Sequence, residues 1–370
     1  MKFLVAPNAM KGAVSAQKLA VIIIKTLRRR FPDAVCISMP AADGGNGTLD
    51  CLMNAFGGTV YELEVTGPIP SMRTTARYGI TADGTGIIES AEAVGLHLLT
   101  PSPATIAHST TRGIGELALA AAARGCTSLV IGLGGTATND GGAGFLRALG
   151  YSLLDEHGEP LKEGSIPLLQ LHSIHPAAAP AINRPVTILS DVRNLLLGPD
   201  GATAVFAPQK GAAEDQRAYL ESALKNFAEI AARDLGARHA EQPGTGAAGG
   251  TAFGILCALQ GSIVPGIEFI LNSSRFDDAL AECDAVITTE GMLDAQTLSG
   301  KGIAGIAERT RKAGKPLHAF VGRVNGDAAA LQRSLGLASL TAVSPDELST
   351  QQAMRDASWL LADALFHHPF

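Results

Sequence analysis

The sequence predicts a two-domain α/β protein, and three observations lead to that prediction. The chain has 370 residues, more than one hydrophobic core usually organises, so about two domains are expected. Hydrophobic residues make up 46% of the chain and charged residues 17%, which is typical of a globular protein rather than a disordered or coiled-coil one. Short apolar runs alternate with segments of helical periodicity, the order that favours a layered α/β sheet.

Five short apolar runs have the composition of buried parallel strands: residues 3–6, 35–39, 129–132, 285–288 and 317–321. Two of the segments between them have clear helix signals. Residues 15–30 begin at Ser15, a good N-cap, and place apolar residues at helical spacing. Residues 111–123 are rich in Ala and Leu and end near Gly125, a residue type common after helices. This pattern predicts a Rossmann-like or flavodoxin-like parallel sheet.

Residues 59–89 follow a different pattern, in which polar and apolar residues alternate and Asp83-Gly84 marks a hairpin turn. Such alternation is typical of antiparallel strands. We therefore expect a second, mixed α/β domain inserted into the first. Residues 1–60, 105–150 and 275–370 would form the Rossmann-like domain, and residues 61–104 and 151–274 the second domain.

The charge and cysteine content exclude several classes of protein. A formal net charge of -6 gives no broad attraction to nucleic acid or to an anionic membrane surface. Five cysteines without a C-x-x-C pair fit a reducing compartment. No apolar stretch is long enough to span a bilayer, and the N-terminus resembles a first strand more than a signal peptide. We expect a cytoplasmic protein that binds small molecules; the oligomeric state stays open, a homo-oligomer included.

Compact polar loops follow three of the predicted strands, at the ends where open α/β sheets bind their ligands. Glycines in such loops let backbone N–H groups approach an anion, and helix N-termini supply a favourable dipole. A tight structural turn explains any one loop about equally well, but three loops with carboxylates and a lysine favour phosphate chemistry. The candidate residues are Asn8, Lys11, Asp43, Gly44, Gly45, Gly134, Gly135, Thr136 and Asn139.

Later segments add the candidates Asp191, Asn194, Lys210 and Asp294. A carboxylate at a strand end can orient a substrate hydroxyl or hold Mg²⁺, and a turn or cap role is the alternative. The standard nucleotide motifs are absent. Gly300-Lys301 is followed by Gly302 rather than by Ser or Thr, and no glycine completes a dinucleotide fingerprint.

The order of these motifs resembles the bacterial glycerate kinase family of the type that lacks a P-loop. The matching segments cover the chain from end to end: residues 6–11, 42–48, 66–68, 132–144, 208–211, 246–250 and 290–297. The resemblance implies ATP-dependent phosphorylation of D-glycerate, typically at the 2-hydroxyl and with Mg²⁺, in a cleft between two α/β domains.

The resemblance also implies roles for individual residues. Asp191 or Asp43 would orient the attacking hydroxyl, and Lys11 would neutralise phosphate or bind the substrate carboxylate. Asp294 would help to hold the metal. The remaining candidates would bind substrate or phosphate: Asn8, Gly44, Gly45, Gly134, Gly135, Thr136, Asn139, Asn194 and Lys210.

The chain departs from the family pattern in its first two loops. An acidic residue followed by Ser and Phe is typical where this chain has Asn8, Ala9 and Met10, and an acidic residue is common where Asn46 stands. Replacing carboxylates by amides removes negative charge and metal-binding capacity. Two alternatives therefore stay open: a kinase for another small hydroxy acid, and a nucleotide-binding module without catalysis.

Overall fold

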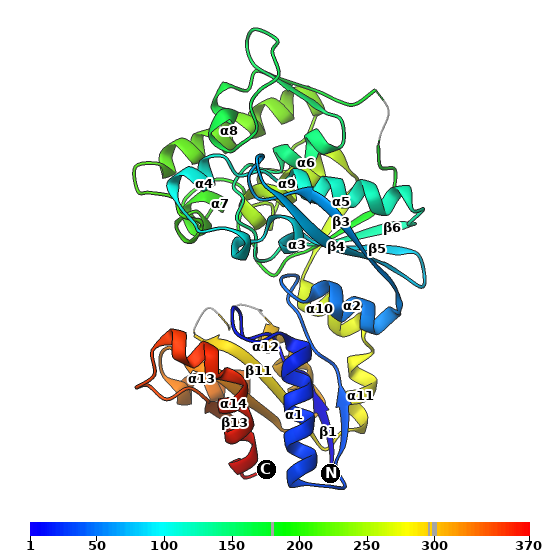
Figure 1. Ribbon diagram of the computed structural model, residues 1–370, viewed down its shortest axis with the longest axis vertical. Helices are drawn as coiled ribbons and strands as arrows, with labels where there is room; N and C mark the ends of the chain where they lie inside the picture. Colours follow the sequence, from blue (N-terminus) through cyan, green and yellow to red (C-terminus); the bar gives the residue numbers. More distant parts are fainter. Residues whose placement is uncertain (179–180, 295–296, 298–301) are drawn as a thin grey trace. The chain divides into compact units, whose positions relative to one another are not determined.

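The computed structural model describes residues 1–178, 181–294, 297 and 302–370 (Figure 1). The chain divides into two compact units: unit 1 comprises Met1–Ala55 and Gly266–Phe370, and unit 2 comprises Phe56–Pro265. Unit 2 is therefore inserted into the chain of unit 1. Unit 1 has a parallel sheet and unit 2 a mixed one, so the predicted fold class is confirmed.

The described residues of unit 1 form five strands and the helices that cover them. The strands are β1 (Lys2–Val5), β2 (Val35–Ser38), β11 (Ala285–Leu293), β12 (Leu317–Val324) and β13 (Ser339–Ala342). The described helices are α1 (Ala16–Arg30), α2 (Thr48–Phe56), α10 (Gly266–Ser273), α11 (Phe276–Glu282), α12 (Gly302–Lys312), α13 (Ala328–Leu335) and α14 (Thr350–His367).

The strands of unit 1 lie in the order β13-β12-β11-β1-β2, and all neighbouring pairs are parallel. The chain moves outward from β1 to β2 and then returns to the other side of β1 at β11. The strand order thus reverses between β1 and β11, as in flavodoxin-like sheets. Ligands of such sheets bind outside the carboxyl ends of the strands at this switch point. The fold therefore positions a site between the loops that follow β1 and β11.

Helices cover both faces of the unit 1 sheet. On one face α1 and α14 lie side by side and share a core with β1 (Figure 1). Helix α1 forms as predicted, because Ser15 accepts a hydrogen bond from the Lys18 N–H at 3.4 Å and Leu19, Ile23 and Leu27 are buried at helical spacing. Helices α10 to α13 contribute to the core on the other face.

Unit 2 is richer in short elements. Its strands are β3 (Gly58–Thr66), β4 (Arg73–Thr81), β5 (Thr85–Glu89), β6 (Ser128–Gly132), β7 (Ser152–Leu154), β8 (Ser173–His175), β9 (Val186–Leu189) and β10 (Gly261–Val264). Its α-helices are α3 (Ser90–Val94), α4 (Pro103–Ala107), α5 (Arg112–Ala123), α6 (Ala143–Ala148), α7 (Ala202–Phe206), α8 (Arg217–Leu235) and α9 (Ala247–Ala258). Its 3₁₀ helices are η1 (Leu96–Leu98), η2 (Ile166–Gln170) and η3 (Pro208–Lys210). None of the helices described in either unit is long and apolar enough to cross a membrane.

The main sheet of unit 2 has the order β10-β9-β6-β5-β4-β3. The alternating segment forms the antiparallel strands β3, β4 and β5, and Gly84 adopts a left-handed φ of +87° in the turn before β5. From β5 onward the strands β5, β6, β9 and β10 are parallel. Each strand lies beside the strand that precedes it in the chain within this sheet, β7 and β8 forming a separate pair, so the order of this sheet does not reverse. Helices α5 and α9 pack in its core.

The structure places residues 105–150 in unit 2, whereas the sequence pattern suggested the Rossmann-like domain. Strand β6 pairs with β5 and β9 and not with a strand of unit 1. Residues 266–274, expected in the second domain, belong to unit 1, where α10 packs. The reason is that a buried parallel strand has the same apolar composition in any sheet. Composition alone does not tell which sheet such a strand joins.

Candidate functional site

A pocket of about 460 Å³ lies at the carboxyl ends of the unit 1 strands. Residues from the loops after β1 and β2, from the ends of β11 and β12, from the segment after β13 and from α14 line it. Of the residues that the structure describes, the ionisable ones in this lining are Lys11, Asp43, Glu290, Asp294 and Arg323. The pocket therefore brings together three residues that the sequence nominated, at the switch point that the topology indicates.

Lys11 and Asp43 form the charged pair of this pocket. The Lys11 Nζ lies 3.4 Å from the Asp43 Oδ2, and the lysine side chain is 64% exposed. The Asp43 Oδ1 accepts a hydrogen bond from the Gly45 N–H at 3.2 Å, and Gly44 between them has a φ of +85°. Gly44 and Gly45 thus form the turn that presents Asp43 to the pocket.

Asp294 stands directly after β11 and is held by Thr297. Its Oδ1 accepts hydrogen bonds from the Thr297 N–H at 3.1 Å and from the Thr297 hydroxyl at 3.3 Å. The rest of the matching segment, residues 295–296, lies outside the described residues, as do Gly300 and Lys301. Among the residues that the structure does describe, no three or more His, Cys, Asp or Glu side chains form a ready metal site. Mg²⁺ is commonly held by one or two carboxylates together with substrate phosphates, and the oxygen donors of Asp43 and Asp294 fit that chemistry.

Like Arg323, Glu290 is an ionisable residue of this pocket that sequence reasoning did not nominate. It lies within β11, which continues to Leu293, beyond the strand predicted for residues 285–288. Its Oε2 accepts a hydrogen bond from the Asn8 Nδ2 at 2.9 Å. Burial raises the pKa of Glu290 to about 7, with Asp43 adding to the increase and the Asn8 hydrogen bond opposing it. An acidic residue at the end of an apolar run was the signal available in the sequence.

Asn8 contributes to the pocket through Glu290. Its side chain is buried, it does not line the pocket, and its Oδ1 accepts a hydrogen bond from the Ala9 N–H at 3.0 Å. The amide therefore orients the Glu290 carboxyl. A carboxylate at position 8 would place a second negative charge beside Glu290, so this departure from the family pattern alters the electrostatics of the pocket.

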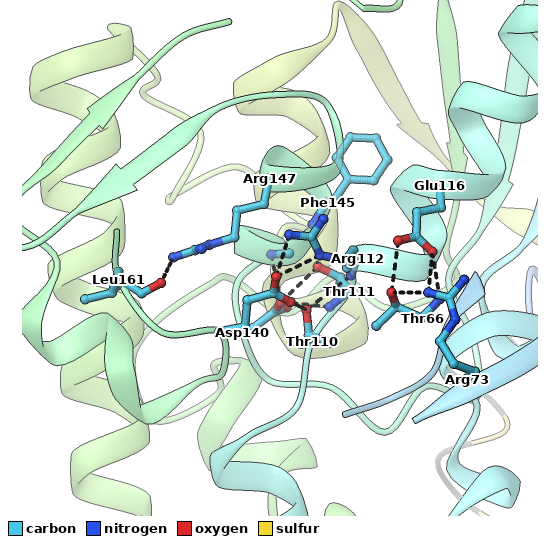
Figure 2. A network of polar contacts seen from close by, with 12 residues as sticks. Thr66, Arg73, Thr110, Thr111, Arg112, Glu116, Asp140, Phe145, Arg147 and Leu161 are labelled. Atoms are coloured by element: carbon cyan, nitrogen blue, oxygen red, sulfur yellow. Dashed lines mark hydrogen bonds and ion pairs between the residues drawn. The ribbon is translucent and has the colours of Figure 1, made fainter. Parts of the chain in front are cut away.

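In unit 2 the 134–144 loop is organised by the buried carboxylate of Asp140 (Figure 2). The Oδ2 of Asp140 accepts hydrogen bonds from the Thr111 N–H at 2.8 Å, the Thr111 hydroxyl at 2.9 Å and the Gly144 N–H at 3.0 Å, and its Oδ1 accepts one from the Gly142 N–H at 3.1 Å. These bonds join the loop to the starts of α5 and α6. Burial raises the pKa of Asp140, and its four donors oppose that change.

Lys210 is buried next to this loop. Its Nζ donates a hydrogen bond to the Thr138 carbonyl at 2.7 Å, and Lys210 as a whole is only 4% exposed. Burial lowers the pKa of Lys210 to about 7, while the charge of Asp140 opposes the decrease. In this structure the ammonium group holds the loop backbone.

Two other nominated residues of the loop have unsatisfied polar atoms. The Thr136 Oγ1 and the Asn139 Oδ1 are buried and have no hydrogen-bond partner among the described residues. The Asn139 Nδ2 donates to the Thr203 hydroxyl at 3.3 Å. Buried polar atoms usually have a hydrogen-bond partner, so these two oxygens are suited to accept a hydrogen bond from a ligand or from water. Gly134 and Gly135 precede them, and the Gly135 carbonyl accepts from the Leu96 N–H at 2.8 Å.

The glycine-rich segment 244–250 packs directly against the 134–144 loop. The Gly141 N–H donates to the Gly249 carbonyl at 3.0 Å. Gly249 has a φ of +67°, and a Cβ there would lie 2.0 Å from the Thr138 carbonyl oxygen. Only glycine fits at this position. The glycine at this position therefore serves the close packing of two backbone segments.

Asp191 and Asn194 follow β9 in unit 2. Asp191 is half-buried at the carboxyl end of that strand. The Asn194 Nδ2 donates to the Asp200 carbonyl at 2.7 Å, and the Asn194 carbonyl accepts from the N–H groups of Gly244 and Gly246. Asn194 thus shapes the loop that carries Asp191.

Comparison with known proteins gives one consistent family. The model of the glycerate kinase family matches residues 3–367. The glycerate kinase of Bacillus subtilis (strain 168) is 38% identical over 97% of this chain and 94% of its own length, and the glycerate 2-kinase of Escherichia coli (strain K12) is 37% identical over 88% and 86%. The crystal structure of a protein described as glycerate kinase 2 from Salmonella typhimurium LT2 superposes with a TM-score of 0.79 at 34% identity, covering 99% of this chain and 96% of that one.

The first prediction concerns Glu290→Gln. The native state keeps the Glu290 proton up to a pH of about 7, whereas an unfolded glutamate releases it near pH 4.5, so stability falls as pH rises through this window. Gln keeps an acceptor for Asn8 and removes that dependence. Urea unfolding at pH 5 and pH 8 should show the wild type losing about 3 kcal/mol more than the variant between the two values. An equal loss of stability in the wild type and in Glu290→Gln would contradict the raised pKa of Glu290. So would removal of the pH dependence by the exposed control Glu347→Gln.

The second prediction concerns Asp140→Asn. An amide cannot accept from all four donors, and its NH₂ group would face other N–H groups in a buried site. Urea unfolding should show a loss of about 3 kcal/mol or more. Asp155→Asn is the matched control, because Asp155 accepts from two backbone N–H groups on the surface, where water can replace the lost bonds and the loss should be much smaller. Similar losses in the two variants would argue against Asp140 as the centre of the loop.

Proposed function

Because the chain belongs to the glycerate kinase family, a family of phosphotransferases, we propose that it transfers the γ-phosphoryl group of ATP to the 2-hydroxyl of D-glycerate. The products are 2-phosphoglycerate and ADP. Similarity across nearly the whole chain carries this proposal, and the relative named glycerate 2-kinase supports the choice of hydroxyl. The pocket of unit 1 supplies the kinds of side chain that phosphoryl transfer uses.

Phosphoryl transfer depends mainly on positioning and on charge stabilisation. The hydroxyl oxygen of glycerate attacks the γ-phosphorus, the bond to the β,γ-bridging oxygen breaks, and the hydroxyl proton passes to a base. Asp191 is our candidate for that base, with Asp43 as the alternative. Lys11 neutralises phosphate charge or binds the glycerate carboxylate. Mg²⁺, held through Asp294, would neutralise charge on the phosphates when bound.

The remaining nominated residues have supporting roles in this proposal. The buried Thr136 hydroxyl and the backbone of Gly134 and Gly135 would contact phosphate or substrate, as would Asn139. Asn194 and Lys210 would act through the loops that they hold, because the Asn194 side chain and the Lys210 ammonium group both donate to backbone carbonyls.

A kinase for a different small hydroxy acid is the second candidate. The observation that favours it is Asn8, which changes the charge beside Glu290 at the pocket. An ADP-release assay with MgATP and a series of C3 to C6 hydroxy acids separates the two. D-glycerate should have the highest kcat/KM. A clearly higher value for another acid would favour the second candidate, and folded protein without turnover on any acid would contradict both.

The third prediction concerns Asp191→Asn. The amide cannot take up a proton at neutral pH, so kcat should fall roughly a hundredfold or more while the circular dichroism spectrum stays unchanged. Asp200→Asn, an exposed residue of the same loop, is the control and should retain activity. Near-normal turnover of Asp191→Asn would transfer the role of base to Asp43.

A further inference from the structure

We propose that the unit 1 pocket binds the nucleotide, with the adenine base against the apolar wall formed by Met10, Met354 and Ala353. This inference rests on the proposed function, because it assigns one of the two substrates of the kinase to a particular pocket. It commits to a nucleotide rather than to the hydroxy acid as the occupant.

The apolar wall comes largely from one face of α14. Thr350, Ala353, Met354 and Ala357 line the pocket, and their spacing places them on a single stripe of the helix. Ser349 fixes the start of α14 through a capping box with Gln352. The apolar stripe therefore lies on the first turns of a helix whose start is fixed by its N-cap.

Methionines give the wall the character of a surface for an aromatic ring. Met10 is buried, whereas Met354 and Met292 are 38% and 54% exposed, although both line the pocket. The Met354 Cε would lie 2.7 Å from a Cβ on Gly12, so this side chain reaches across to the loop after β1. Thioether sulfur makes favourable contacts with aromatic rings, and an unbranched side chain adapts to their shape. A nucleobase offers such a ring, and glycerate does not.

The size and the charge distribution of the pocket favour the same occupant. A volume of about 460 Å³ falls within the range of roughly 300–1,000 Å³ typical of pockets for larger ligands, and a three-carbon acid would fill little of it. The pocket also contains Lys11, Asp43 and Asp294, which suit phosphates accompanied by a divalent cation. A ligand with an apolar ring at one end and charged phosphates at the other matches both parts of this lining.

The topology supports this location independently. The pocket lies where the strand order of a flavodoxin-like sheet reverses, and the loop after β1 and the C-terminal part of β11 contribute Lys11 and Glu290 to it. Nucleotide-like ligands of doubly wound sheets bind at this point. The parallel part of the unit 2 sheet has no such reversal.

The test is the binding of ATP and of inorganic tripolyphosphate, each with Mg²⁺, measured by calorimetry without hydroxy acid. Wild-type protein should bind ATP at least about tenfold more tightly than tripolyphosphate, because the base adds apolar contacts. Met354→Asp places a charge in the wall and should abolish most of that difference. Met354→Ala, a milder change, should reduce it in part. Trp359→Asp, an exposed substitution on the same helix, should leave it intact.

Steady-state kinetics of Met354→Asp gives the second measurement. The KM for ATP should rise roughly tenfold or more, and the KM for the hydroxy acid should change by less than about twofold. A rise confined to the KM of the hydroxy acid, or equal binding of ATP and tripolyphosphate by the wild type, would overturn the proposal. If no acid is phosphorylated, the proposed function fails, whereas the calorimetry still decides whether the pocket binds the nucleotide.

Discussion

The parallel arrangement of strands is the constraint on which the candidate site depends. Parallel strands have their carboxyl ends at one edge of the sheet, so the loops that follow them meet there even when they are far apart in the sequence. In unit 1 this shared edge places Lys11 and Asp43, from the start of the chain, in one pocket with Glu290 and Asp294, which come much later in the sequence. The insertion of unit 2 between β2 and β11 does not interrupt the unit 1 sheet, because the described strands of unit 2 pair within sheets of their own.

The glycine-rich loops combine structural and chemical tasks. In unit 2 the Asp140 carboxylate and the Lys210 ammonium group are used within the fold, and Gly249 allows two backbone segments to touch. The 134–144 loop leaves the Thr136 hydroxyl and the side-chain oxygen of Asn139 without hydrogen-bond partners among the described residues. A rigid internal framework that leaves a few polar atoms unsatisfied is a suitable basis for ligand binding, because the donors and acceptors are held in place before the ligand arrives.

Much of this architecture could be predicted from the sequence, since apolar runs and caps are local signals. Strands β1, β2 and β6 and helix α1 lie close to their predicted bounds, and β11 and β12 begin where predicted but extend further, to Leu293 and Val324. The domain to which β6 belongs could not be predicted, because strand pairing is a long-range property. Glu290 was missed for a related reason: its pKa of about 7 results mainly from burial, with Asp43 adding to the increase against the opposing Asn8 hydrogen bond, and only the folded chain creates this environment. Lys210 was nominated as a phosphate ligand from its loop alone, and its bond to Thr138 depends on a contact across 72 positions of the chain.

Phosphorus NMR of the reaction product tests the proposed chemistry most directly, because one spectrum reports whether a phosphoryl group was transferred and which hydroxyl received it. The protein should be incubated with MgATP and D-glycerate, and the product compared with authentic 2-phosphoglycerate and 3-phosphoglycerate. The resonance of 2-phosphoglycerate, growing together with that of ADP, is the expected result. The resonance of 3-phosphoglycerate, or unchanged ATP in the presence of folded protein, would contradict the proposed reaction.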